Sequence, residues 1–117
     1  MSNTPDPENS RTNKTNEAGQ EKLAELDRLR NEILSSSPEI VIANHCFGLF
    51  ELAAIYLSDS PPRLRDATLA IDALAGLAGS IKGRLGEYEL EILDGISQLR
   101  LAFVQMSTLS TETAKTD

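Results

Sequence analysis

His45 and Cys46 are the only histidine and the only cysteine of the chain, and their side chains come closest to those of a metal site or a nucleophilic pair. Neighbouring residues on a helix point about 100° apart, so the two cannot hold one ion in the usual way. A Cys–His catalytic pair also needs its side chains to face each other. We therefore expect structural roles, with Cys46 a small buried hydrophobe and His45 satisfied by a hydrogen bond. The sequence predicts no catalytic residue, no cofactor and no bound metal.

Asn44 and Glu51 form a second polar pattern, because they share one face of a predicted helix with Gly48 between them. Three interpretations stay open. The residues form the solvent-facing strip of the helix, or a polar contact that fixes helix register in an assembly, or a small ligand or catalytic site. Together with His45 they are the candidate polar or register site.

Two further patterns resemble binding sites without meeting the requirements of one. The acidic residues near position 90 lie along one helix start and diverge, whereas a hard cation needs converging oxygens. Their charges instead suit the positive end of the helix dipole. The glycines of the second half match neither the dinucleotide-binding nor the P-loop spacing. The residues concerned are Glu87, Glu89, Glu91, Asp94, Gly76, Gly79, Gly83 and Gly86.

Length and charge limit the classes of protein to be considered. A chain of 117 residues holds one domain at most. Its net charge is -7, and no basic cluster is present to neutralise phosphates, so we expect no nucleic-acid partner. The N-terminus has no basic segment followed by an apolar core, so no signal peptide is expected. These features predict an acidic cytoplasmic protein.

The stretch from Pro38 to Leu57 carries the most concentrated hydrophobicity of the chain. A helix that is apolar on nearly every side must be covered on nearly every side, so the other segments are interpreted as its cover. Its length also raises the question of a membrane span. The polar residues Asn44, His45 and Glu51 inside it favour a buried helix of a soluble protein, and we expect no membrane partner.

The apolar periodicity predicts an all-α fold, a small bundle with core helices near residues 38–57, 63–82 and 87–106. Residues 17–35 are predicted to form an amphipathic helical arm with a narrow apolar stripe. The arm either docks on the core or pairs with its copy in another subunit. Residues 1–16 and 107–117 contain few apolar side chains and are predicted to be disordered tails, which leaves residues 38–106 as the core domain.

Two of the three core helices are apolar on more than one face, which predicts a homo-oligomer, with a dimer favoured. The competing covers are the chain's own arm or a different, unidentified protein. The candidate interface residues are Phe47, Phe50 and Tyr56 on the first core helix and Ala70, Ala73 and Leu77 on the second.

Four segments carry a resemblance to a known family: LAAIYL, LAIDALAGL, GRLGE and LRLAFVQ. From Glu39 to Met106 the chain resembles a bacterial family of short all-helical proteins known as domain of unknown function number eighteen forty-four. Many relatives have Asn-Leu-Thr where this chain has Arg84-Leu85-Gly86, which leaves a weaker helix cap here. The resemblance implies a helical bundle and supplies no activity, substrate or cofactor.

Two classes of function remain. The first is a non-enzymatic interaction or scaffold protein that acts as a homo-oligomer. The alternative is a small-ligand-binding protein or an enzyme that uses the neighbourhood of Asn44, His45 and Glu51.

Overall fold

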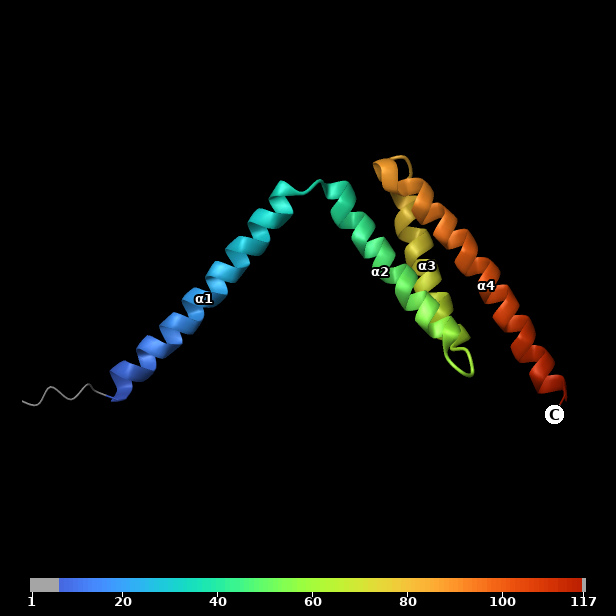
Figure 1. Ribbon diagram of the computed structural model, residues 1–117, viewed down its shortest axis with the longest axis horizontal. Helices are drawn as coiled ribbons and strands as arrows, with labels where there is room; N and C mark the ends of the chain where they lie inside the picture. Colours follow the sequence, from blue (N-terminus) through green and yellow to red (C-terminus); the bar gives the residue numbers. More distant parts are fainter. Residues whose placement is uncertain (1–6, 117) are drawn as a thin grey trace, which may run out of the picture. The chain divides into compact units, whose positions relative to one another are not determined.

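The computed structural model describes the backbone of residues 7–116 and the side chains of residues 16–111, and over that range it contains helices and no strand (Figure 1). The predicted all-α class is therefore confirmed. The elements are α1 (Pro7–Ser35), α2 (Pro38–Ser58), α3 (Leu64–Ser80), the short 3₁₀ helix η1 (Gly86–Tyr88) and α4 (Glu89–Thr116). The chain divides into two compact units, one containing α1 and the other beginning at Pro38, and each is described by itself.

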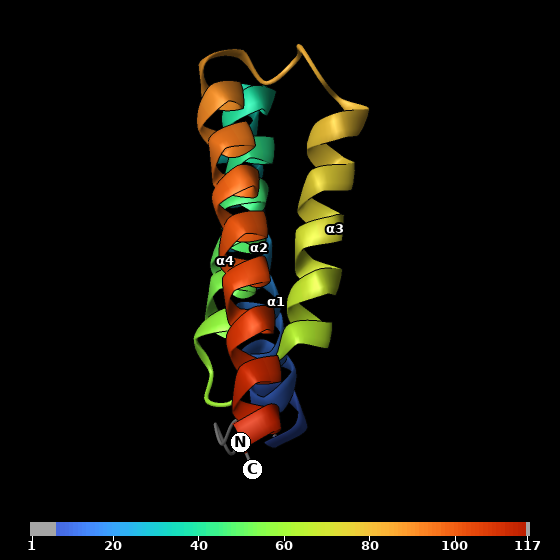
Figure 2. The same cartoon turned by 90° about the vertical axis from the view of Figure 1, so that its right-hand side faces the viewer.

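In the second unit α2, α3 and α4 lie side by side, and each contacts the other two (Figures 1 and 2). Their contact is most extensive between α2 and α3, where small side chains let the backbones approach. The middle of each helix contributes residues that are buried against the other two. The buried residues are Ala43, Cys46, Ala53, Leu57, Ala67, Ala70, Ile71, Leu74, Ala78, Leu85, Ile92, Ile96 and Leu99.

The connection between α3 and α4 depends on two glycines. Gly83 has φ +82° and Gly86 has φ +59°, a left-handed conformation that other residues rarely adopt. Between them Leu85 is turned inward and buried, and the Gly83 N–H donates to Oε1 of Glu89. Gly83 thus takes a left-handed conformation just after the end of α3. However, α3 ends at Ser80 rather than near residue 82, and η1 precedes α4.

Helix α1 and helix α4 are both longer than the sequence indicated. The backbone is helical from Pro7, within the predicted tail 1–16, and α4 continues to Thr116 through most of the predicted tail 107–117. Low hydrophobicity removes tertiary support from a segment, but it does not by itself end a helix. No proline follows Pro7 before the end of α1, and neither proline nor glycine follows Gly95. Residues 1–6 and 117 of the predicted tails lie outside the described residues.

Within the described residues one helix, α2, is long and apolar enough to cross a bilayer by length and composition alone. The core helix of a soluble protein passes the same test, so the absence of a membrane span stays a prediction.

The packing of α3 predicts a sharp contrast between two of its leucines. Leu74 is 1% exposed and Leu69 is 74% exposed. Replacing Leu74 with Ala should lower the free energy of unfolding by about 2–5 kcal/mol, because a cavity replaces the side chain. The control Leu69→Ala should change it by less than about 0.5 kcal/mol. Urea denaturation followed by circular dichroism measures both values, and equal losses would contradict this packing.

Candidate functional site

The candidate polar residues Asn44, His45 and Glu51 are all exposed on α2, and so is Gly48 between them. They occupy the side of the helix that the core leaves free, and the hollows of the second unit described below are lined by other residues. The solvent-facing interpretation of this strip therefore agrees with its position. The helical position of His45 turns it outward, and its hydrogen bond stays a prediction.

Cys46 lies one position further along α2 and is completely buried, as predicted. Burial raises the pKa of its thiol, because the protein interior solvates the thiolate poorly. A protonated thiol is a poor nucleophile and a poor metal ligand. Among the residues that the structure describes, no three His, Cys, Asp or Glu side chains are grouped so as to hold a metal ion.

The candidate interface residues have different surroundings. Phe47, Phe50, Tyr56 and Leu77 are half-buried and Ala73 is exposed. Ala70 is 3% exposed and belongs to the core of the chain itself, so its assignment to an outer face is wrong. Small residues on α3 allow a second helix to approach closely. At Ala70 that helix belongs to the same bundle.

Tyr56 is partly covered from within the chain. The guanidinium carbon of Arg63 lies 4.8 Å from the centre of its ring, and the Arg63 N–H donates to the Tyr56 carbonyl at 2.9 Å. Arg63 also pairs with Asp66 at 2.7 Å. These contacts connect the end of α2 with the start of α3, so part of the Tyr56 surface is already used inside the fold.

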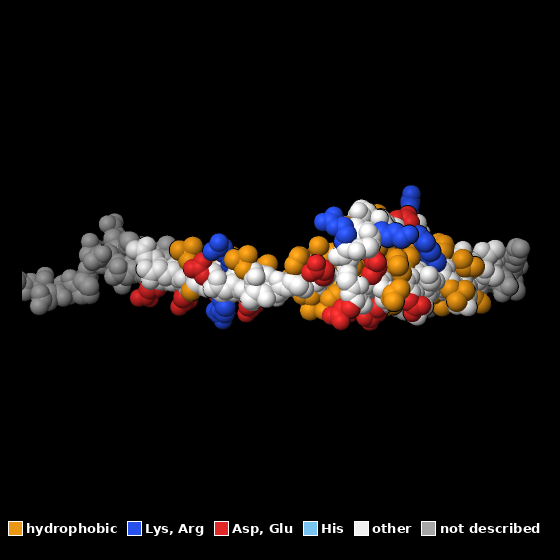
Figure 3. All heavy atoms as spheres, turned by 90° about the horizontal axis from the view of Figure 1, so that it is seen from above, with side chains coloured by type: hydrophobic (Ala, Val, Ile, Leu, Met, Phe, Trp, Pro, Cys, Tyr) orange, Lys and Arg blue, Asp and Glu red, His pale blue; other side chains and the backbone are white. Residues whose placement is uncertain are grey.

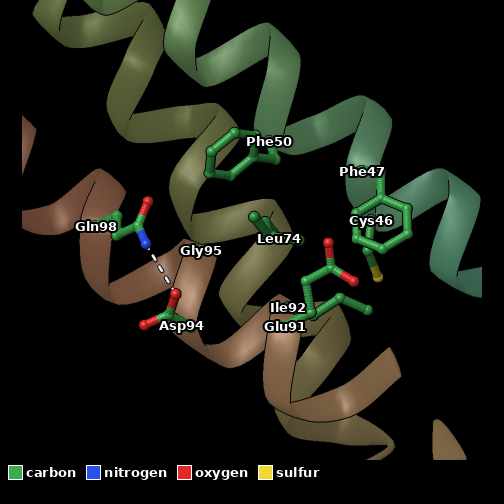
Figure 4. A pocket seen from close by; sticks show the side chains of 9 residues that line it. All are labelled: Cys46, Phe47, Phe50, Leu74, Glu91, Ile92, Asp94, Gly95 and Gln98. Carbon is green, nitrogen blue, oxygen red and sulfur yellow. Dashed lines mark hydrogen bonds between the residues drawn. The ribbon is translucent and has the colours of Figure 1, made fainter. Parts of the chain in front are cut away.

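A hollow of about 220 Å³ lies between α2 and α4, with side chains of three helices around it (Figure 4). Leu74 of α3 and Cys46 form its floor, and the rings of Phe47 and Phe50 form the α2 wall. The α4 wall is acidic and polar. There the amide of Gln98 donates to Oδ2 of Asp94 at 2.7 Å, and the Glu91 carboxylate points toward α2.

Two further hollows continue the first along the same pair of helices. The second, of about 270 Å³, shares Phe50 and Gln98 with the first. The third, of about 600 Å³, shares Leu57, Ser58 and Met106 with the second and reaches Leu109. The three together are one long depression, called here the α2–α4 groove.

Comparisons of the chain with protein-family models, with curated proteins and with solved structures find no match. The family resemblance therefore stays a prediction, and the groove is interpreted from its own residues. Half-buried aromatic rings, two carboxylates and an amide form a surface suited to holding an apolar segment that carries a positive charge.

One glycine in the sequence indicates this groove. Gly95 lies within the apolar half of α4, where a glycine weakens a helix and needs a packing reason. The reason is Phe50, since a Cβ added at Gly95 would lie 3.2 Å from Cδ2 of its ring. Glu91 and Asp94 were interpreted as acidic residues that suit the helix dipole, and they also line the groove.

The burial of Cys46 predicts an unreactive thiol. The native protein should react with a thiol reagent such as dithionitrobenzoate at least about a hundredfold more slowly than the urea-unfolded protein. A matched control moves the thiol by one position, with Cys46→Ala and His45→Cys in the same chain. That variant should react at nearly the unfolded rate, and fast labelling of native Cys46 would contradict its burial.

The contact between Gly95 and Phe50 predicts different effects of alanine at two glycines. At Gly76 a new Cβ meets nothing within 4 Å, so Gly76→Ala should stabilise the protein by about 0.5–1 kcal/mol. Gly95→Ala should give a smaller gain or a loss, because the half-buried Phe50 ring must move. Thermal unfolding of the two variants measures the difference, and equal gains would show that Phe50 does not pack on Gly95.

Proposed function

We propose that this chain is a non-enzymatic interaction or scaffold protein that acts as a homo-oligomer, with a dimer favoured. The observation that supports this proposal is the amount of apolar side chain on the outside of the second unit. Leu90 is 81% exposed and Leu101 is 61% exposed, and neither belongs to the buried seam of α4. Orange side chains accordingly reach the surface of this unit in Figure 3.

The exposed apolar residues of α4 follow helical spacing and so form a second stripe. Leu90, Leu93, Leu101 and Val104 share one face, which is turned away from the seam of Ile92, Ile96 and Leu99. On α2 the exposed face adds Leu52 and Ile55 to the polar strip. Soluble monomers rarely expose contiguous apolar patches of more than a few hundred Å², so these faces favour association.

The alternative function, ligand binding or catalysis around Asn44, His45 and Glu51, has less support. The three side chains are exposed and come from one face of one helix. A catalytic or ligand site normally draws groups from several elements into a concave surface. The candidate residues lack both properties.

The partner and location that we propose follow from charge and composition. A net charge of -7 without a basic cluster suits a protein partner better than a nucleic acid, and it suits a soluble cytoplasmic protein. We also retain the proposed membership of the bacterial helical family, which rests on the segments quoted above.

Light scattering coupled to size exclusion tests the oligomer directly. At micromolar concentration the full chain should have at least twice the chain mass of 12.7 kDa. The expected reason is burial of the exposed leucines between copies. A single species at the chain mass, unchanged on concentration, would overturn the proposal.

The α4 stripe predicts which substitution should weaken the oligomer. Leu101→Glu places a charge on the stripe and should increase the dissociation constant by at least about tenfold. The control Gln105→Glu adds the same charge to an exposed polar position one turn away and should change it by less than about threefold. Equal effects of the two substitutions would show that charge alone, rather than the apolar stripe, controls assembly.

A further inference from the structure

Helix α1 carries an apolar stripe with one positive charge inside it. Leu23, Leu26 and Ile33 are 57% exposed or more. Arg30 lies on the same face, because it follows Leu26 by four residues and precedes Ile33 by three. Along α1 in Figure 3 the orange side chains gather mainly on one edge and the acidic ones mainly on the other. A helix in water gains little from such a stripe unless a second surface covers it.

The α2–α4 groove has the complementary properties. It has aromatic walls from Phe47 and Phe50, and its only charged lining residues in the first hollow are the carboxylates of Glu91 and Asp94. The groove extends along α4 from Glu91 to Leu109, about 27 Å at the helical rise of 1.5 Å per residue. The apolar stripe of α1 from Leu23 to Ile33 is about 15 Å long and covers part of this length.

We infer that α1 of a second copy of this chain docks in the α2–α4 groove, with Arg30 paired to Glu91. The inference rests on the proposed homo-oligomer and adds, beside the α4 stripe, a second pair of surfaces through which it forms. In a symmetric dimer each copy supplies one helix and receives one, so both grooves are covered. Each groove, with α2, α3 and α4, then becomes a four-helix bundle.

Two observations favour a second copy over the chain's own arm. Only Ser36 and Ser37 separate α1 from α2, and a connection this short favours exchange of a helix between copies over a tight reversal. The exchange also brings two copies together, as the exposed leucines of α4 require.

The alternating direction of helices in a bundle sets the register of the docked helix. Because α2 and α4 run in the same direction, the docked α1 runs opposite to both. With Arg30 level with Glu91, Leu23 then lies level with Gln98, because both pairs are separated by two helical turns along their own helices. Side chains at one level on antiparallel helices lean in opposite directions, each toward its own helix N-terminus, and the long Arg30 side chain spans the resulting offset to the Glu91 carboxylate.

Charge reversal tests the proposed pair in the full-length protein. Arg30→Glu should increase the dissociation constant of the oligomer, measured by light scattering on dilution, by at least about tenfold. The control Arg28→Glu makes the same change on the opposite face of α1 and should have less than about a twofold effect. Combining Arg30→Glu with Glu91→Arg should restore the constant to within about threefold of the natural chain. Absence of a difference between Arg30→Glu and Arg28→Glu would overturn the inference.

Cross-linking distinguishes the occupants of the groove. In a Cys46→Ala background, Leu23→Cys and Gln98→Cys should react with a short bismaleimide to give a covalent dimer on a denaturing gel. Arg28→Cys with Gln98→Cys is the control and should not react. A cross-link within single chains would show that α1 docks on its own core. A stable oligomer without any cross-link would show that another surface holds the copies together. In that last case the oligomer proposal stands and the groove inference fails, whereas a monomer without any cross-link contradicts both.

Discussion

The close approach of α2 and α3 is the constraint on which the rest of the second unit depends. Ala43 and Ala53 on one helix and Ala67, Ala70 and Ala78 on the other are buried, so the backbones are separated by little side-chain volume. Such a seam packs well but removes little apolar surface from water for each residue ordered. The large side chains that would enlarge the core, such as Phe47, Phe50 and Phe103, are displaced to the edges of the seam and are only half-buried.

That displacement explains the shape of the α2–α4 contact. With an aromatic ring at Phe50, α4 approaches α2 only where it presents a residue without a side chain, and Gly95 supplies that position. On either side of this point the two helices leave the hollows that form the groove. The groove is therefore a consequence of small residues in one seam and aromatic residues in the next, and its polar rim comes from the α4 residues that flank Gly95.

The sequence predicted the helical class because burial follows the helical period, as at Ile71, Leu74, Ile92 and Ile96. The apolar stripe of α4 and the α2–α4 groove were not predicted, and each has a physical reason. Glu91 and Asp94 marked one side of α4 as solvated, which hid the apolar stripe of Leu90 and Leu101 beside them. The groove joins residues of α2 to residues of α4 that are far apart in the chain, and periodicity within single helices does not reveal which faces meet. The candidate polar residues Asn44, His45 and Glu51 were found because Asn44 and Glu51 share one helix face, and polar side chains of a single exposed face point into solvent instead of converging on a ligand.

An alanine-rich seam also links assembly to folding. A three-helix unit of this size has one small core, and such cores contribute only a few kcal/mol beyond the entropy of ordering the chain. Covering Phe47 and Phe50 with the apolar stripe of α1 would add large side chains to the core where the α2–α3 seam has few. In the proposed dimer the docked helix would be stabilised by the groove and the groove by the helix, so dissociation would expose apolar surface on both. The stability of such a protein depends on its concentration, because the second copy is a ligand of the folded state.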